Sequence, residues 1–349
     1  MNTRILFYPT LLFMGFLLQS CGSQANTPDV SSIDIPLELV RYEKQFFAID
    51  TARLDETLSN LYNKEQAFTV DFLTKILGLE NIDSALWPTS IRQFISTYRS
   101  VAEITQMQDK EIEEAFSQTR SALRYVKHYF PSYELPKKMI TFIGPIDAFA
   151  YGQTGGGGEI ITPEAIGIGL QLHLGANAEL YHTDEGMQLY PSYLSRRFTP
   201  DYIPINAMRT IVDDIYPPLN GGSNLLELLI DHGKRMHLLD LFLPDAADTL
   251  KLGYTRVQLN GMEENEGFIW NYFKENNLLY ENDVLKIRSF VSDGPSTAEF
   301  GLGSPGFTSL YIGRQIIRAY LDQFPETTVQ QLLSTYAQTI LKGSGYRPK

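Results

Sequence analysis

Along most of the chain, hydrophobic residues recur at the spacing of an α-helix. Over residues 91–130 they stand three or four positions apart, with Lys and Glu between them, so this segment is predicted to be helical up to Pro131. Helical patterns dominate again from Ile203 onward. There, Asn224 and Glu227 have the spacing of a capping box that opens a helix. Further helices are expected at 283–292, 312–324 and 329–341.

Strand patterns are confined to the middle of the chain. Residues 139–143 and 148–151 are expected to be strands, 155–158 a turn, and 159–174 a third and a fourth strand. In the last of these, at 166–174, hydrophobic residues alternate with smaller or polar ones, so one face is expected to be buried. The sequence therefore predicts an α+β fold that is predominantly helical with one small β-sheet.

The N-terminal residues have the pattern of a bacterial sorting signal. Arg4 precedes an uncharged apolar stretch at 5–18, which has the length of a signal-peptide core and is short for a transmembrane helix. Leu-Gln-Ser-Cys-Gly at 18–22 resembles a lipobox, and it places Cys21 where a diacylglyceryl group is attached. Residues 1–20 are therefore predicted to be a lipoprotein signal peptide, and Cys21 is the lipidation site and membrane anchor. A plain cleaved signal peptide is the alternative.

The rest of the chain divides into a tether and one domain. Residues 21–32 are polar and contain Gly and Pro, which is typical of a flexible tether. Residues 33–349 contain no repeat and no linker, so they are expected to form a single mostly helical α+β domain. No acidic run follows Cys21, and we therefore expect the anchored protein at the outer membrane, facing the periplasm.

Composition excludes several classes of protein. A hydrophobic fraction of 43% is enough for a folded core. The formal net charge of −12 argues against a nucleic-acid partner, because binding to phosphate backbones needs a basic surface. The chain has one Cys, so neither a disulfide framework nor a zinc site built from several thiolates is expected.

Motifs for the common enzyme chemistries are missing. The glycine run at 155–158 precedes a strand and is not followed by the Lys-Ser or Lys-Thr of a phosphate loop. There is no Gly-x-Ser-x-Gly and no His-Glu-x-x-His. His232 and His237 are five positions apart, about 140° around a helix, and cannot chelate one ion from a straight helix. No catalytic, cofactor-binding or metal-binding residue is nominated, and a non-enzymatic role is favoured.

Two alternatives stay open. The first is a cryptic metal-dependent hydrolase that draws on the carboxylates and imidazoles of the helical part, namely Asp213, Asp214, Glu227, Asp231, His232 and His237. The second is a periplasmic lipoprotein that binds peptides or glycans in an aromatic groove, since the chain contains 20 Tyr and 20 Phe. Gly233 is expected to permit close packing of a helix on a strand, and contact of Lys234 with a ligand is a further alternative.

Several sequence blocks, in a fixed order, cover nearly all of the chain after the predicted signal peptide. They are LVRYEKQFF at 39–47, VKHYFP at 126–131, AIGIGLQLHLG at 165–175, DHGKRM at 231–236 with Leu243-Pro244, GYT at 253–255 with Gln258, Asn265 and Ile269-Trp270, SPG at 304–306, GRQII at 313–317, and KGSGYRPK at 342–349. Together they resemble the gliding-motility lipoprotein family GldB of the Bacteroidetes. Gln171 and His173 stand where that family often has Asp and Tyr.

The resemblance implies a non-catalytic envelope lipoprotein that is required for gliding and linked to the accompanying protein secretion. Its implied partners are the membrane, reached through Cys21, and envelope proteins of that machinery, and no cofactor is implied. The family is also distantly similar to gluzincin-type zinc peptidases. That similarity implies a degenerate zincin-like arrangement, in which the edge strand is 166–174, the zinc helix is 206–215 and the second helix is 225–237. Ligands or the base are then expected at Met208, Arg209 and Val212, so the implied fold is a pseudoenzyme scaffold.

Overall fold

The structure is a computed structural model of the chain, and it describes residues 27–149, 157–219 and 221–349. Cys21, the predicted signal peptide and the first part of the predicted tether lie outside these residues and stay predictions. The last residues of the predicted tether are described, and Val30 among them is buried.

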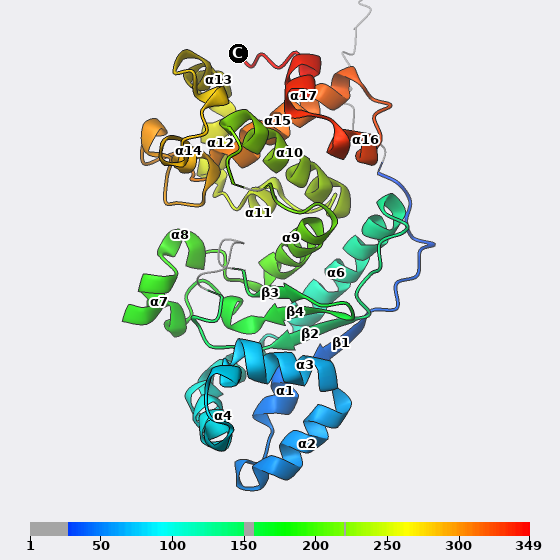
Figure 1. Cartoon of the computed structure of the whole chain (residues 1–349), viewed down its shortest axis with the longest axis vertical. Helices are drawn as coiled ribbons and strands as arrows, with labels where there is room; N and C mark the ends of the chain where they lie inside the picture. Colours follow the sequence, from blue (N-terminus) through cyan, green and yellow to red (C-terminus); the bar gives the residue numbers. More distant parts are fainter. Residues whose placement is uncertain (1–26, 150–156, 220) are drawn as a thin grey trace, which may run out of the picture.

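A four-stranded mixed sheet crosses the middle of the described chain (Figure 1). Its strands are β1 (Glu38–Arg41), β2 (Lys138–Phe142), β3 (Glu159–Ile161) and β4 (Ala165–Gly169), in the order β1-β2-β4-β3. The first three in this order are parallel, and β3 is antiparallel to β4 at the edge. The remaining regular structure is helical, so the predicted α+β fold with one small sheet is confirmed.

Helices cover both faces of the sheet: those of residues 42–107 gather on one side, whereas the long helix of residues 109–129 lies on the other side, with the C-terminal helices (Figure 1). In chain order the elements up to residue 129 are α1 (Tyr42–Phe47), α2 (Leu54–Lys64), α3 (Gln66–Asp71), α4 (Trp87–Thr97), α5 (Arg99–Met107) and α6 (Asp109–Tyr129). Tyr42, Phe46 and Phe72 form a buried aromatic cluster that packs α1 against the turn after α3. Burial of these large rings stabilises this side of the molecule.

The other side of the sheet is covered by the C-terminal half. Its helices are α7 (Asp184–Leu189), α8 (Ser192–Ser195), α9 (Ile203–Ile215), α10 (Leu225–Phe242), α11 (Asp248–Leu252), α12 (Arg256–Glu264), α13 (Glu266–Glu275), α14 (Val284–Val291), α15 (Thr308–Gln323), α16 (Val329–Ser334) and α17 (Ala337–Ser344). The capping box predicted at Asn224 and Glu227 is present, with both reciprocal hydrogen bonds at 3.0 Å. The predicted helices at 283–292 and 312–324 correspond to α14 and α15.

The segment 91–130 is helical, as predicted, but it holds three helices and not one continuous helix. The chain turns between α4 and α5 at Tyr98 and between α5 and α6 at Gln108, where ψ is 12° and 20°. The Tyr98 hydroxyl accepts a hydrogen bond of 2.8 Å from the Ile146 N–H, a contact that fixes the first turn from a distant part of the chain. Hydrophobic spacing continues through both turns, so periodicity alone does not show them.

The helix predicted at 329–341 is likewise two helices, α16 and α17. The break follows from Lys234, a buried cation on α10. Its Nζ donates hydrogen bonds to the carbonyls of Leu333 (2.9 Å) and Thr335 (2.8 Å), which are thereby lost to a continuous helix. A buried ammonium needs such acceptors, and the backbone supplies them by turning.

The sheet also differs from its prediction. Strand β1 lies in a segment for which no strand was predicted. Of the strand predicted at 148–151, residues 148 and 149 form a turn, and the rest lies outside the described residues, as does part of the turn predicted at 155–158. Strand β4 ends at Gly169, and Leu170–Leu172 forms a 3₁₀ turn.

Both faces of β4 are buried, whereas one buried face was expected. The small residues that alternate in this strand are glycines packed against neighbours. A Cβ on Gly167 would lie 2.6 Å from the Ile160 side chain on β3, and a Cβ on Gly169 would lie 2.8 Å from the Gly158 carbonyl oxygen. The small residues that alternate along β4 therefore allow the edge strand β3 to approach closely, and they do not mark a face exposed to solvent.

Helices α10 and α15 pack closely against each other through glycines. A Cβ on Gly233 would lie 2.3 Å from the Gly313 carbonyl oxygen, and a Cβ on Gly313 would lie 1.9 Å from the Leu229 carbonyl oxygen. Gly233 thus permits close packing on a helix, and the expected packing on a strand is wrong. The glycine costs helix propensity, and the close approach of two buried helices offsets that cost.

We expect Gly313→Ala to lower the free energy of unfolding by about 3 kcal/mol, because the added methyl must push apart two helix backbones. Gly261→Ala on α12 is the matched control: a Cβ there meets nothing within 4 Å, and Ala is expected to stabilise by about 0.5–1 kcal/mol through helix propensity. Urea unfolding of both variants provides the measurement. Equal stabilities would contradict the close contact.

Candidate functional site

A cleft of about 730 Å³ opens between β3, α9, α10 and the segment that follows α14. This volume lies within the range of small-molecule and peptide sites. Its apolar wall includes Phe198, Tyr202, Leu228, Met236, Leu239 and Leu310. Its charged wall includes Glu159, Arg197, Arg209, Asp213, Asp231, His232, Arg235 and Asp293. We refer to this site as the α9–α10 cleft.

Each of the two helices α9 and α10 carries an Arg and an Asp one helical turn apart, and these two pairs face each other across the cleft. Arg209 and Asp213 are four positions apart on α9, and Asp231 and Arg235 are four apart on α10, so each pair shares a helix face. Arg235 joins the two helices: its Nε lies 2.8 Å from Asp231 Oδ2 and its Nη1 lies 2.5 Å from Asp213 Oδ1. Its Nη2 donates to the Tyr216 carbonyl at 2.7 Å. Both carboxylates are therefore held by one guanidinium.

Burial is the main influence on the Asp213 carboxyl. It raises the pKa of this group, and the positive charges of Arg235 and Arg209 oppose the shift. Asp231 is 4% exposed, so the pair it makes with Arg235 is largely shielded from water. Removal of Arg235 would leave the buried Asp231 and the partly buried Asp213 without their cation, which is unfavourable.

Arg209 has a different environment from the other cleft arginines. Arg197 pairs with Asp293, whereas Arg209 makes one hydrogen bond, from Nη2 to the Lys251 carbonyl oxygen at 2.9 Å. Within the described residues no carboxylate pairs with Arg209. Burial lowers the pKa of Arg209, and the neighbouring charge of Arg197 lowers it further.

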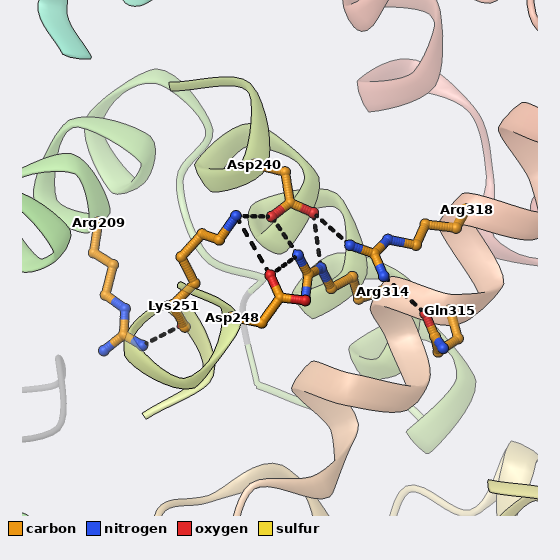
Figure 2. A network of polar contacts seen from close by, with 7 residues as sticks. All are labelled: Arg209, Asp240, Asp248, Lys251, Arg314, Gln315 and Arg318. Atoms are coloured by element: carbon orange, nitrogen blue, oxygen red, sulfur yellow. Dashed lines mark hydrogen bonds and ion pairs between the residues drawn. The ribbon is translucent and has the colours of Figure 1, made fainter. Parts of the chain in front are cut away.

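A buried ionic network lies behind Arg209 (Figure 2). Arg314, 3% exposed, donates two hydrogen bonds to Asp240 (2.7 and 2.6 Å) and one to Asp248 (2.6 Å). Lys251 Nζ lies 2.7 Å from the same Asp240. Because the Lys251 side chain is held by these aspartates, its carbonyl is a fixed acceptor for Arg209, as Figure 2 shows.

The edge strand supplies a second buried polar pair at the rim of the cleft. Glu159 on β3 lies 2.6 Å from His173 Nε2, and the other ring nitrogen lies 3.1 Å from the Thr199 carbonyl oxygen. Asn206 on α9 donates to the same Glu159 oxygen at 3.4 Å. These contacts tie the edge strand to the start of α9.

The fold places only some of the candidate residues for a metal-dependent hydrolase in the cleft. Asp213, Asp231 and His232 line the cleft, whereas Asp214, Glu227 and His237 do not contribute to its lining. Asp214 accepts a hydrogen bond from the Tyr133 hydroxyl (2.6 Å), and Glu227 caps α10. No group of three or more His, Cys, Asp or Glu with metal-binding geometry occurs in the part of the chain that the structure describes.

Sequence reasoning missed the arginines that determine the charge of the cleft, Arg197 and Arg235, and the edge-strand residue Glu159. The sequence did contain a pattern that indicates some of these charged residues. The i, i+4 spacing of Arg209 with Asp213 and of Asp231 with Arg235 marks two charged helix faces. That those faces meet depends on the packing of α9 against α10, which no local pattern contains.

His232 gives the cleft a measurable pH dependence. Its Nδ1 lies 2.8 Å from the Ser309 hydroxyl, and burial lowers its pKa to about 4, with Asp231 opposing and Arg235 adding to the shift. The folded state therefore holds the neutral ring, whereas the unfolded chain takes up a proton below about pH 6.5. Stability falls as the pH drops from about 6.5 towards 4.

Between pH 7 and pH 5, we expect the free energy of unfolding of His232→Gln to fall by about 2 kcal/mol less than that of the wild type. Urea unfolding at the two pH values measures this difference, and titrating groups common to both proteins cancel. His182→Gln, at an exposed position, is the control and should behave like the wild type. A His232→Gln variant with the wild-type pH dependence would contradict the buried neutral ring.

No helix among the described residues has the length and apolar character needed to cross a membrane. No curated protein and no solved structure gives a significant match to the chain. The family model described as gliding motility protein GldB matches residues 23–348. The match spans the sheet, both helical sides and the α9–α10 cleft, and the chain therefore belongs to the GldB gliding-motility family.

Proposed function

We propose that this protein is a lipid-anchored, non-catalytic component of the cell envelope that gliding motility and the accompanying protein secretion require. The observation that carries the proposal is the family match over residues 23–348, which begins two residues after Cys21. Acyl chains on Cys21 would hold the protein at the outer membrane, facing the periplasm, in a gliding bacterium of the Bacteroidetes. Several acyl chains give firm anchoring, at about 0.8 kcal/mol per buried CH₂.

The chemistry of the cleft supports a role without catalysis. Asp213 and Asp231 each have one oxygen engaged by Arg235, and this positive charge disfavours a proton or a metal ion on either carboxylate. His232 is hydrogen-bonded to Ser309 and buried. A general base must reach the proton that it removes, and each of these groups already makes a contact within the protein, although Asp231 Oδ1 has no partner among the described residues.

We also propose that the frame of the cleft is a degenerate zincin-like arrangement. The expectation of an edge strand at 166–174 is wrong, because β4 is an inner strand and the edge is β3. In support of the arrangement, α9 packs on this edge strand β3 and on α10, where a second helix was expected. Met208 and Val212, two positions where ligands were expected, are buried apolar residues. The third, Arg209, has its side chain in the cleft and carries a charge that repels a metal ion. A stoichiometric metal held by residues of α9 and α10 would contradict this assignment.

We expect depletion of the protein in its host to abolish colony spreading and to lower the amount of secreted protein. A wild-type copy should restore both, and a Cys21→Ala copy should restore neither, because it has no thiol to acylate. Asn26→Ala, in the same polar segment, is the matched control and should restore both. Normal spreading and secretion after complete depletion would contradict the proposed role.

Anchoring is measured separately from motility. Cells grown with an alkyne-labelled fatty acid should label the wild type and Asn26→Ala proteins, and leave Cys21→Ala unlabelled. A Cys21→Ala protein that still carries the label would show that the anchor lies elsewhere, whatever the spreading assay gives.

A further inference from the structure

We propose that the α9–α10 cleft binds a peptide that carries a free carboxylate, and that Arg209 holds this carboxylate. The inference rests on the non-catalytic role proposed above, since it assigns the cleft to binding. It starts from the one cleft arginine that has no acidic partner among the described residues.

The N–H donors of Arg209 are mostly unused. A guanidinium has five N–H donors in a rigid fork, and one of the nitrogens of Arg209 donates to the Lys251 carbonyl. Arg197 and Arg235, which line the same cleft, are paired with Asp293 and with Asp213 and Asp231. A partly buried cation without a counterion is costly, and an anion in the cleft would remove that cost.

Arg209 is one of three neighbouring guanidinium groups, although the whole chain carries −12. Arg196 and Arg197 lie close enough for their charges to interact with each other, and Arg197 likewise interacts with Arg209. Arg196 donates to the Gly253 carbonyl, so it too is held by a neutral acceptor. Asp293, the partner of Arg197, is the carboxylate near all three guanidinium groups; Asp213 also acts on Arg209, but it is paired with Arg235. The cluster can therefore accept one further negative charge.

The rest of the cleft limits the charge and the character of the ligand. Glu159, Asp213 and Asp231 line it too, and they disfavour a dianion such as a phosphate monoester. The apolar wall is suited to aliphatic or aromatic side chains, and Asn206 and Thr210 offer polar groups to a peptide backbone. A peptide with one carboxylate combines these features, and about 730 Å³ accommodates several of its residues.

Arg209 is positioned before any ligand arrives. Its acceptor, the Lys251 carbonyl, belongs to the residue whose ammonium is held by Asp240 and Asp248. Pre-organisation of this kind lowers the entropic cost of forming the charged hydrogen bonds. The network in Figure 2 thus acts on the cleft through the placement of Arg209.

The test uses the full chain, extracted in detergent, and two pools of N-acetylated hexapeptides made of uncharged residues. One pool has free C-terminal carboxylates and the other has amidated C-termini, so the carboxylate is the only difference between them. Ultrafiltration followed by mass spectrometry measures retention. We expect the free-acid pool to be retained at least about tenfold more than the amidated pool, as charge-assisted hydrogen bonds provide.

Arg209→Gln removes the charge but keeps an N–H donor for the Lys251 carbonyl, and it should abolish the preference for free acids. Arg209→Lys keeps the positive charge but lacks the planar fork of the guanidinium, and it should retain only part of the preference for free acids. If Arg209→Gln fails to fold, the comparison of Arg209→Lys with the wild type is the test. Arg256→Gln on α12 makes the same charge change at an exposed position and should match the wild type.

Equal retention of the two pools, retention of neither, or a free-acid preference that survives in folded Arg209→Gln would overturn the inference. Octanoate, an apolar carboxylate without peptide bonds, is added as a competitor; full displacement of the peptides at equimolar octanoate would assign the cleft to fatty acids instead. Peptide fragments in the retained pool would overturn the non-catalytic role but leave binding supported. Loss of spreading on depletion, with no peptide retained, would leave the proposed function in place and overturn this inference alone.

Discussion

The close contact between α10 and α15 determines where the charged side chains of the cleft point. Gly233 faces Gly313 so closely that no side chain fits between the two backbones. Residues two positions apart on a helix point about 200° apart. Asp231 and Arg235 therefore lie on the side of α10 opposite the contact, and this side faces α9 and the cleft. One packing constraint between two helices thus sets the orientation of a charged surface on the far side of one of them.

Two buried ionic groups then fix the neighbours of α10. Arg314 follows Gly313 directly and binds Asp240 on α10 and Asp248 on α11, whereas Arg235 joins α10 to Asp213 on α9. Buried ion pairs add little net stability, because desolvation offsets much of their attraction. Their effect here is on geometry, because a guanidinium that donates two hydrogen bonds to a carboxylate restricts where that carboxylate can lie. They select one relative placement of α9, α10 and α11, and with it the position of Arg209 through the Lys251 carbonyl.

Much of the fold could be predicted from local sequence, and little of the site. The α10 start was predictable because a capping box is a four-residue pattern, and β2 because its hydrophobic run ends at Gly144-Pro145. Strand β1 was missed because its partner on β2 is about a hundred residues away. The turn between α16 and α17 was missed because a lysine far earlier in the chain binds its carbonyls.

The charge of the cleft was missed for the same reason. Arg197 and Asp293 are 96 positions apart, and Arg235 and Asp213 are 22 apart. Two carboxylates that meet across two helices need a cation between them. A divalent metal in that place keeps an open coordination position for water or substrate, whereas a guanidinium uses its planar fork for the carboxylates themselves. Arg235 therefore takes one oxygen of each carboxylate, and Arg209 is the cleft arginine that has no acidic partner among the described residues. In the binding proposed for this cleft, the carboxylate of the ligand would take at Arg209 the place that Asp213 and Asp231 take at Arg235.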